Sequence, residues 1–146
     1  KINRVFVDGT EVTDAIRTPE VTAIVSRVAA IGAVREAMVD QQRRMGEAGG
    51  VLMDGRDIGT VVLPHAQVKI YLTASSMVRA KRRYDELTAK GESCDLEKIR
   101  QDIEDRDYRD MHRETSPLKQ AEDAVLVDTS DMTIEQVIDR IVALIG

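Results

Sequence analysis

The predicted helix at residues 95–114 changes chemistry halfway along its inward face. Its first apolar positions are spaced three and four residues apart, as in a core-facing stripe: Leu96, Ile99 and Ile103. The next positions at the same spacing are charged: Arg106, Asp110 and Arg113. At 100° per residue these charges fall within about 60° of one another. The pattern therefore predicts a helix that enters the core and ends in a cleft, where it meets an anionic, hydroxyl-bearing ligand.

The same segment has a simpler interpretation. Residues 104–110, EDRDYRD, alternate in charge. Such alternation is also typical of a surface helix with weak ion pairs between positions four residues apart. Two further arginine-bearing segments favour the cleft.

The first of these segments is VLMDGRDIGTVV, residues 51–62. The apolar run 51–53 predicts a buried strand that ends in a turn, and ligands collect at the carboxyl ends of strands in open α/β sheets. A carboxylate at Asp54 suits Mg²⁺ bound through water, and Arg56 suits a phosphate. Gly55 and Gly59 allow the backbone to approach a ligand. The alternative is a turn held by a structural Asp–Arg pair.

The second segment is a predicted helix that begins near Ser76 and ends near Gly91. Three arginines share one of its faces: Arg79, Arg82 and Arg83. They indicate either a solvated helix with ion pairs to the acids at 85 and 86, or a mobile lid that brings positive charge to a phosphoryl group in transfer.

The remaining pattern alternates strands and helices. A hairpin is predicted around Asp8-Gly9, and helices at about 19–29 and 32–47. Strands are predicted at 68–74 and 124–130, with a final helix at 134–145 behind a Thr133/Gln136 capping box. Strand, helix and strand in alternation predict an α/β fold with a parallel sheet.

Composition excludes several classes of protein. The 146 residues carry a net charge of −5 and few aromatic side chains, which argues against nucleic-acid binding. No apolar run reaches transmembrane length, so no membrane contact is expected. The single cysteine, Cys94, cannot form an internal disulfide, and a cytoplasmic location is expected. His65 and His112 lack metal-ligand spacing.

Four segments together resemble bacterial cytidylate kinases: IRTPEVTAIVSRVAAIGAVREAMVDQQRRM, DGRDIGTVVLPHAQVKIYLTAS, RAKRRYDEL and RDYRDMHRETSPLKQAEDAVLVDTS. The resemblance runs from about Val7 to the C-terminus. It implies a P-loop NTPase-like parallel sheet flanked by helices, with a small α+β insertion that binds CMP. The implied reaction transfers the γ-phosphoryl group of ATP, with Mg²⁺, to CMP or dCMP, giving CDP or dCDP.

One part of the family pattern is missing. Nothing in the chain matches the glycine-rich phosphate loop G-x-x-x-x-G-K-[ST] or a near variant. We therefore expect the C-terminal portion of the enzyme: a sheet incomplete at the N-terminus, with the CMP-binding insertion at 1–47 and the core at 48–146, including a lid at about 76–92. Such a chain alone is expected to be inactive and to self-associate through exposed apolar surface, whereas the full enzyme is expected to be monomeric.

The resemblance also implies roles for individual residues. Those matching base contacts are Ser26, Arg35 and Asp57. Those matching ribose contacts are Arg106 and Asp110. Those matching phosphate contacts are Arg56 and Arg113, with Arg83 in the lid and Arg79 or Arg82 as helpers. Those bordering the adenine of ATP are Asp128 and Thr129, and Asp54 matches a carboxylate that orients Mg²⁺ through water.

Alternatives remain open at this level. Ser26 is also compatible with an ordinary helix serine, and Arg35 with a surface arginine. A UMP or AMP kinase of the same superfamily, a non-catalytic nucleotide-binding module and a helix-rich interaction domain are the competing functions.

Overall fold

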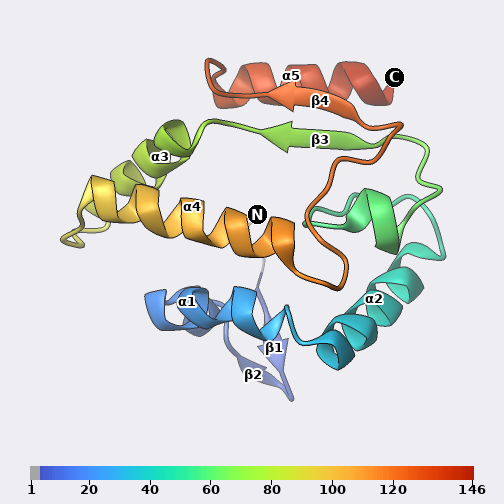
Figure 1. Ribbon diagram of the computed structural model, residues 1–146, viewed down its shortest axis with the longest axis horizontal. Helices are drawn as coiled ribbons and strands as arrows, with labels where there is room; N and C mark the ends of the chain where they lie inside the picture. Colours follow the sequence, from blue (N-terminus) through green and yellow to red (C-terminus); the bar gives the residue numbers. More distant parts are fainter. Residues whose placement is uncertain (1–3) are drawn as a thin grey trace.

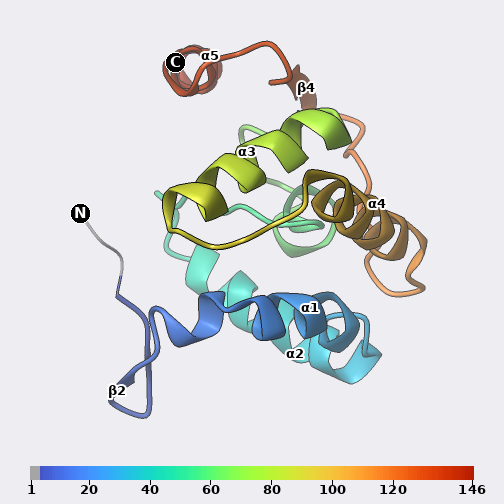
Figure 2. The same ribbon diagram turned by 90° about the vertical axis from the view of Figure 1, so that its left-hand side faces the viewer.

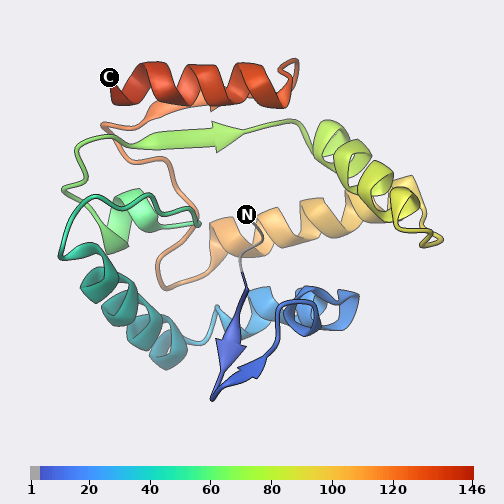
Figure 3. The same cartoon turned by 180° about the vertical axis from the view of Figure 1, so that it is seen from behind.

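Helix α4 lies in the middle of the molecule, with a sheet on one side and a group of helices on the other (Figures 1 and 3). The computed structural model describes residues 4–146, apart from the side chains of Pro19 and Ser26. In chain order the elements are β1 (Phe6–Val7), β2 (Thr10–Glu11), the 3-10 turn η1 (Ala15–Arg17), α1 (Pro19–Val28), α2 (Gly32–Gly46), the π-helical turn η2 (Ile58–Val62), β3 (Ile70–Thr73), α3 (Ser76–Ala89), α4 (Leu96–His112), β4 (Val125–Asp128) and α5 (Ile134–Ile145).

Four of the five α-helices in residues 4–146 begin where a polar side chain satisfies a backbone N–H group of the first turn, whereas α2, preceded by Ile31, has no such bond. Thr18, Ser75 and Asp95 each accept a hydrogen bond from the N–H three residues ahead, and the bond from Lys98 N to Asp95 is 2.7 Å long. Thr133 and Gln136 form the reciprocal capping box at α5. Helix starts are thus set by local sequence, which is why they were predicted correctly.

The two small sheets have the pairing that the sequence predicted. Asp8 and Gly9, at φ 48° and 79°, form the left-handed turn of the β1–β2 hairpin. Strands β3 and β4 pair in parallel, with Ile70 opposite Val125 and Thr73 opposite Asp128. Helices α3 and α4 lie between them in sequence. The described chain is therefore a mixed α/β structure with a small parallel sheet flanked by helices.

The prediction of a strand at 51–53 is wrong. Residues 50–54 are irregular, and Val51 and Leu52 are 45% and 79% exposed. A strand exists only when a neighbour pairs with its backbone, and no strand in residues 4–146 lies beside this segment. The turn η2 that follows was not predicted, since a single π-helical turn has no distinctive sequence pattern.

Apolar burial is divided between two places. Val39 of α2 and Val62 of η2 are buried where these elements pack together, and Ala74 after β3, Ala80 of α3 and Val127 of β4 are buried in the half of the molecule that contains the parallel sheet and α3. Helix α5 lies at the far end of the molecule from α1 and α2 (Figure 2). The apolar side chains of α5 that remain exposed are Ile134, Ile138, Val142 and Ile145. None of the helices in residues 4–146 has the length and apolar character needed to cross a lipid bilayer.

Candidate functional site

A cavity of about 150 Å³ opens between α1, α2, the loop before η2 and the C-terminal half of α4. Six charged side chains line it: Arg35, Arg56, Asp57, Arg106, Asp110 and Arg113. The remaining lining residues are Val25, Ala29, Gln42, Gly55 and Ile58. The charged continuation of the α4 stripe therefore faces a cavity together with residues 56 and 57, which confirms the cleft prediction.

An ion pair between α2 and the loop forms one wall of the cavity. Arg35 donates from Nε to Asp57 Oδ2 at 3.1 Å and from Nη2 to Oδ1, a bidentate arrangement. Asp57 is 1% exposed, and the Arg35 side chain is 12% exposed. Gly55 leaves room for this loop, because a Cβ there would lie 2.9 Å from Ile58 Cγ1. The Asp57 carboxylate is thus held in a fixed direction.

Asp110 forms the opposite wall and is the centre of an arginine cluster. Arg56 donates from Nε to Asp110 Oδ2 at 3.1 Å. Arg106 Nε and Arg113 Nη1 approach its carboxylate at 3.9 and 3.8 Å, which are ion-pair rather than hydrogen-bond distances. Arg113 ends α4 and donates from Nε to the carbonyl oxygen of Ser116 at 2.7 Å. Three guanidinium groups therefore share one carboxylate that is 3% exposed.

The cavity contains unsatisfied hydrogen-bonding capacity. In the part of the chain that the structure describes, three buried side-chain polar atoms lack a hydrogen-bond partner, and all belong to residues lining this cavity: Gln42 Oε1, Arg106 Nε and Arg113 Nη2. Buried polar groups are normally paired, because an unpaired one costs about 1–3 kcal/mol. Two of these atoms are cationic donors and one is an acceptor. A ligand that accepts hydrogen bonds at one end and donates at the other would satisfy all three.

The electrostatics favour an anion. Four arginines share the cavity with two aspartates, an excess of two positive charges. Burial lowers the pKa of the Arg35, Arg106 and Arg113 guanidinium groups, and the charge of Arg56 lowers the pKa of Arg106 and Arg113 further. These shifts mean that positive charge is crowded and poorly solvated here, which is the environment that binds phosphate.

The structure separates the remaining predicted site residues from the cavity. Within the described residues, its lining does not include Asp54, Arg83, Asp128 or Thr129. The side chain of Ser26, predicted to contact the base, lies outside the described part. Thr129 is 4% exposed and donates from its hydroxyl to the carbonyl oxygen of Thr73 at 3.0 Å. Asp128 accepts from the N–H and the hydroxyl of Ser130.

The three arginines of α3 have partners within the chain. Arg79 binds both carboxylate oxygens of Asp107 on α4, at 3.1 and 2.5 Å. Arg82 donates to the carbonyl oxygen of Thr129 at 2.6 Å, which ties α3 to the loop after β4. Arg83 pairs with Glu86 on the surface at 2.8 Å. Among these three arginines, Arg83 is thus the one that pairs along the helix surface in the described residues. The solvated interpretation holds further for the two acids, because Asp85 pairs with Lys81 and Glu86 also pairs with Lys90.

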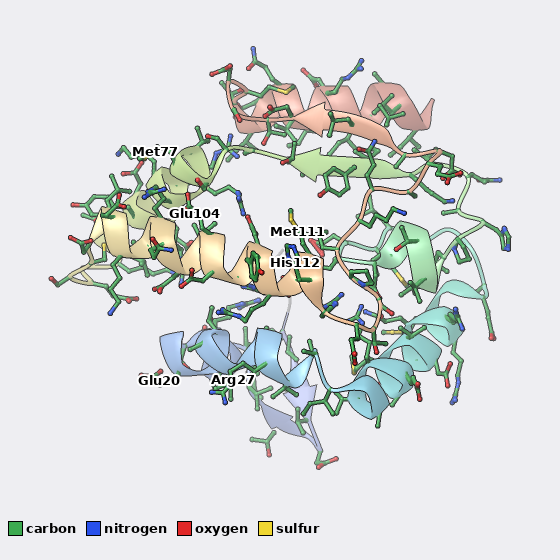
Figure 4. The ribbon with its side chains drawn as sticks, in the orientation of Figure 1. Glu20, Arg27, Met77, Glu104, Met111 and His112 are labelled. Carbon is green, nitrogen blue, oxygen red and sulfur yellow. The ribbon has the colours of Figure 1, made fainter. Side chains whose placement is uncertain are left out.

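A second contact between α3 and α4 lies near Met77 and Glu104, which Figure 4 labels. Glu104 accepts from the hydroxyl of Ser76 at 2.7 Å and from Arg100 Nη1 at 2.5 Å. Together with the Arg79–Asp107 pair, this contact fixes α3 across α4. The α3–α4 packing in turn determines where the charged end of α4 points.

Residues 4–146 contain no cluster of three or more side chains suited to holding a metal ion. Asp54 is exposed on the loop before Gly55. A single carboxylate suits Mg²⁺ only when water and substrate phosphates supply most of the ligands. The arrangement fits that water-mediated mode and no tighter one.

The sequence interpretation missed Gln42. It lies seven residues after Arg35 on α2, which is close to two helical turns and therefore on the same face. Because Arg35 faces the cavity, this spacing could have placed Gln42 there as well. No charge or motif marks it as a binding residue, so the signal existed only in combination with the orientation of Arg35.

Comparison with known proteins identifies the family of the chain. The profile of the cytidylate kinase family matches residues 1–146. A cytidylate kinase of Phocaeicola vulgatus is 56% identical over 131 residues, which cover 90% of this chain and 57% of that protein. A cytidylate kinase of Streptococcus pneumoniae (strain Hungary19A-6) is 55% identical over 139 residues, covering 95% of this chain and 62% of that protein. The chain thus spans about 60% of the length of these relatives. The chain belongs to the cytidylate kinase family.

Proposed function

We propose that the cavity binds CMP or dCMP as the phosphoryl acceptor of an ATP-dependent cytidylate kinase. The observation that carries this proposal is the set of unpartnered buried donors, Arg106 Nε and Arg113 Nη2, in a cavity with an excess of two positive charges. A phosphate monoester carries about −1.5 to −2 charges near neutral pH and several strong acceptor oxygens. Such a group matches the charge and the Arg113 donor, and an oxygen of the attached ribose matches the Arg106 donor.

The roles of the residues follow from their placement on the two walls. Arg56 and Arg113 bind the phosphate of the substrate. Asp110, with Arg106 beside it, accepts hydrogen bonds from the ribose hydroxyl groups. Arg35 and Asp57, with Ser26, bind the base, and Asp57 accepts from the amino group that cytosine has and uracil lacks. Residues 1–47 then contribute to the base, and residues 48–146 contribute to the sugar, the phosphate and, through Asp57, the base.

Catalysis by these residues is positioning and charge neutralisation. An oxygen of the CMP phosphate attacks the γ-phosphorus of ATP in line, and ADP leaves. The arginines neutralise charge on the oxygens of the acceptor, so no protein nucleophile is required. Asp54 would hold Mg²⁺ through water when the ion binds with ATP, and the ion would supply further charge neutralisation. Arg83 exchanges its surface partner Glu86 for the transferring group, and Asp128 and Thr129 border the adenine.

We further propose that the 146 residues bind the acceptor but do not transfer phosphate alone. They contain no glycine-rich loop with a lysine to hold the ATP phosphates. The arginines of the cavity neutralise charge without aligning ATP with CMP. Alignment supplies roughly 7–11 kcal/mol of the barrier reduction in well-oriented reactions.

The test is a coupled phosphoryl-transfer assay with CMP, dCMP, UMP and AMP. It uses two proteins: the 146-residue chain and an extended protein, meaning this chain extended to the length of its cytidylate kinase relatives. The expected result is turnover of CMP and dCMP by the extended protein only. Preferred turnover of UMP or AMP would replace the acceptor assignment. Binding of CMP without turnover in the extended protein would indicate a non-catalytic nucleotide-binding module, and no nucleotide binding by either protein would indicate an interaction domain.

A further inference from the structure

Gln42 is a polar cavity residue to which the proposed function gives no role. Its Oε1 atom is buried and lacks a hydrogen-bond partner, and its side chain lines the cavity. Neighbouring Gln41 on the same helix is exposed. A buried amide oxygen without a partner is costly unless a ligand satisfies it. The atom therefore indicates a ligand donor at this point of the cavity.

The position of Gln42 assigns it to the base side of the cavity. Helix α2 packs against η2, and Asp57 directly precedes η2. Arg35 and Gln42 lie on one face of α2, so both reach the cavity from the same wall as Asp57. Arg106, at the proposed ribose position, and Arg113, at the proposed phosphate position, come from α4 and its end, on the opposite wall.

We propose that Gln42 positions the pyrimidine by accepting one N–H of its exocyclic amino group, while Asp57 accepts the other. The inference rests on the proposed function, because it presupposes a cytosine nucleotide in the cavity. A buried amino group has two N–H donors and needs two acceptors. Arg35 holds both oxygens of Asp57 in place, which fixes the direction of the first acceptor. Gln42 Oε1 supplies the second.

This arrangement also determines the response to a base with a carbonyl group at the same position. The amide of Gln42 can turn by 180° and donate to a carbonyl, whereas the Asp57 carboxylate can only accept. Gln42 is therefore a positioning residue with limited selectivity of its own. A carboxylate at position 42 would remove the option of donating, and so would increase discrimination against a uracil nucleotide.

The experiment is calorimetric titration of the extended protein with CMP, UMP and ribose 5-phosphate, which carries the phosphate and the sugar but no base. Gln42→Met preserves the length of the side chain and removes the acceptor. We expect a roughly tenfold rise in Kd for CMP. We expect the Kd for ribose 5-phosphate to change less than twofold. Gln42→Glu should retain CMP binding within about threefold while weakening UMP binding more than CMP binding.

Gln41→Met is the matched control, since it makes the same chemical change at the neighbouring exposed position. It should leave all three dissociation constants unchanged. Two results would overturn the assignment: CMP affinity within twofold of wild type in Gln42→Met, or equal weakening of CMP and ribose 5-phosphate, which would show a purely structural role. Failure of the wild-type extended protein to bind CMP would instead reject the proposed function, so the two failures are distinguishable.

Discussion

Two regions of the molecule differ in how far the chain itself pairs or covers their side chains. One is the cavity between α2 and α4, and the other is the sheet end formed by β3, β4 and α5. At the cavity, the charged groups Asp57 and Asp110 are buried and paired with arginines of the same chain. At the sheet end, apolar side chains such as Leu72, Leu126 and Val142 are 53%, 55% and 59% exposed. The chain thus builds the walls of its polar site from its own residues but leaves apolar surface uncovered at the sheet.

Under the proposed function, this difference separates two requirements of phosphoryl transfer. Recognition of an acceptor needs a few side chains held in direction, and the ion pairs around Asp57 and Asp110 provide this. Alignment of two substrates needs a continuous sheet that carries both sites on one frame. The cavity and the sheet end should therefore respond differently to mutation and to extension of the chain.

The largest expected effect is on turnover. If the cavity is complete and the donor site is not, the 146-residue chain should phosphorylate CMP at least roughly 10⁵-fold more slowly than the extended protein, the rate equivalent of lost alignment. A coupled assay with ATP and CMP measures both proteins. Comparable turnover in the two proteins would show that the ATP site lies within residues 1–146. It would contradict the proposal that this chain has a complete acceptor cavity and an incomplete ATP site.

The next largest effect is on stability. Asp57→Ala leaves the Arg35 guanidinium buried without its partner, which should reduce the free energy of unfolding by about 3–5 kcal/mol. Asp85→Ala is the matched control, because Asp85 pairs with Lys81 on the surface, where both side chains are more than half exposed. It should cost at most about 1 kcal/mol. Chemical denaturation of the extended protein compares them, and equal losses would mean that the Arg35–Asp57 pair is not a buried support of the cavity.

An intermediate effect is expected on substrate use. Asp110→Ala in the extended protein removes the carboxylate that three arginines share, which is also the proposed acceptor for the ribose hydroxyl groups. The loss of a hydrogen bond to a charged group costs roughly 1.5–3 kcal/mol, so kcat/KM for CMP should fall by about 10- to 150-fold. Steady-state kinetics measures the change. A change of less than twofold would show that Asp110 makes no such contact.

The smallest effect on stability is expected at the sheet end. Ile138→Ser on α5 changes a side chain that is 53% exposed and should alter the free energy of unfolding of the 146-residue chain by about 0.5 kcal/mol or less. The same change should reduce self-association, because exposed apolar patches recruit other chains. Sedimentation velocity at several concentrations measures association. A wild-type chain that stays monomeric at high concentration would contradict the prediction that this surface is adhesive.

The sequence predicted the parts of the structure that depend on local pattern. The stripe on α4, the hairpin turn at Asp8-Gly9 and the capping box at Thr133 are all encoded within a few residues. The strand at 51–53 could not be judged in this way, because strand formation depends on a neighbouring strand. A local pattern is sufficient for a helix start but insufficient for a strand.

The side-chain partners at the site show the same limit. The predicted charges at 56, 57, 106, 110 and 113 meet in one cavity, since the α4 stripe fixed the direction of three of them. The partners of Arg79 and Arg82 lie 28 and 47 residues away, on α4 and after β4. Such partners are set by how the helices pack, which no local pattern reports. Gln42 was missed for a related reason, because its environment is known only once α2 is docked against η2.

The most direct test of the central claim, that the cavity is a nucleotide phosphate site built by this chain, is calorimetric titration of the 146-residue chain with CMP and with cytidine. The account predicts that CMP binds at least roughly tenfold more tightly, because its phosphate satisfies the buried donor of Arg113, which cytidine leaves unpaired. Arg113→Met should remove most of that difference. Equal affinity for CMP and cytidine in the wild-type chain would contradict the claim.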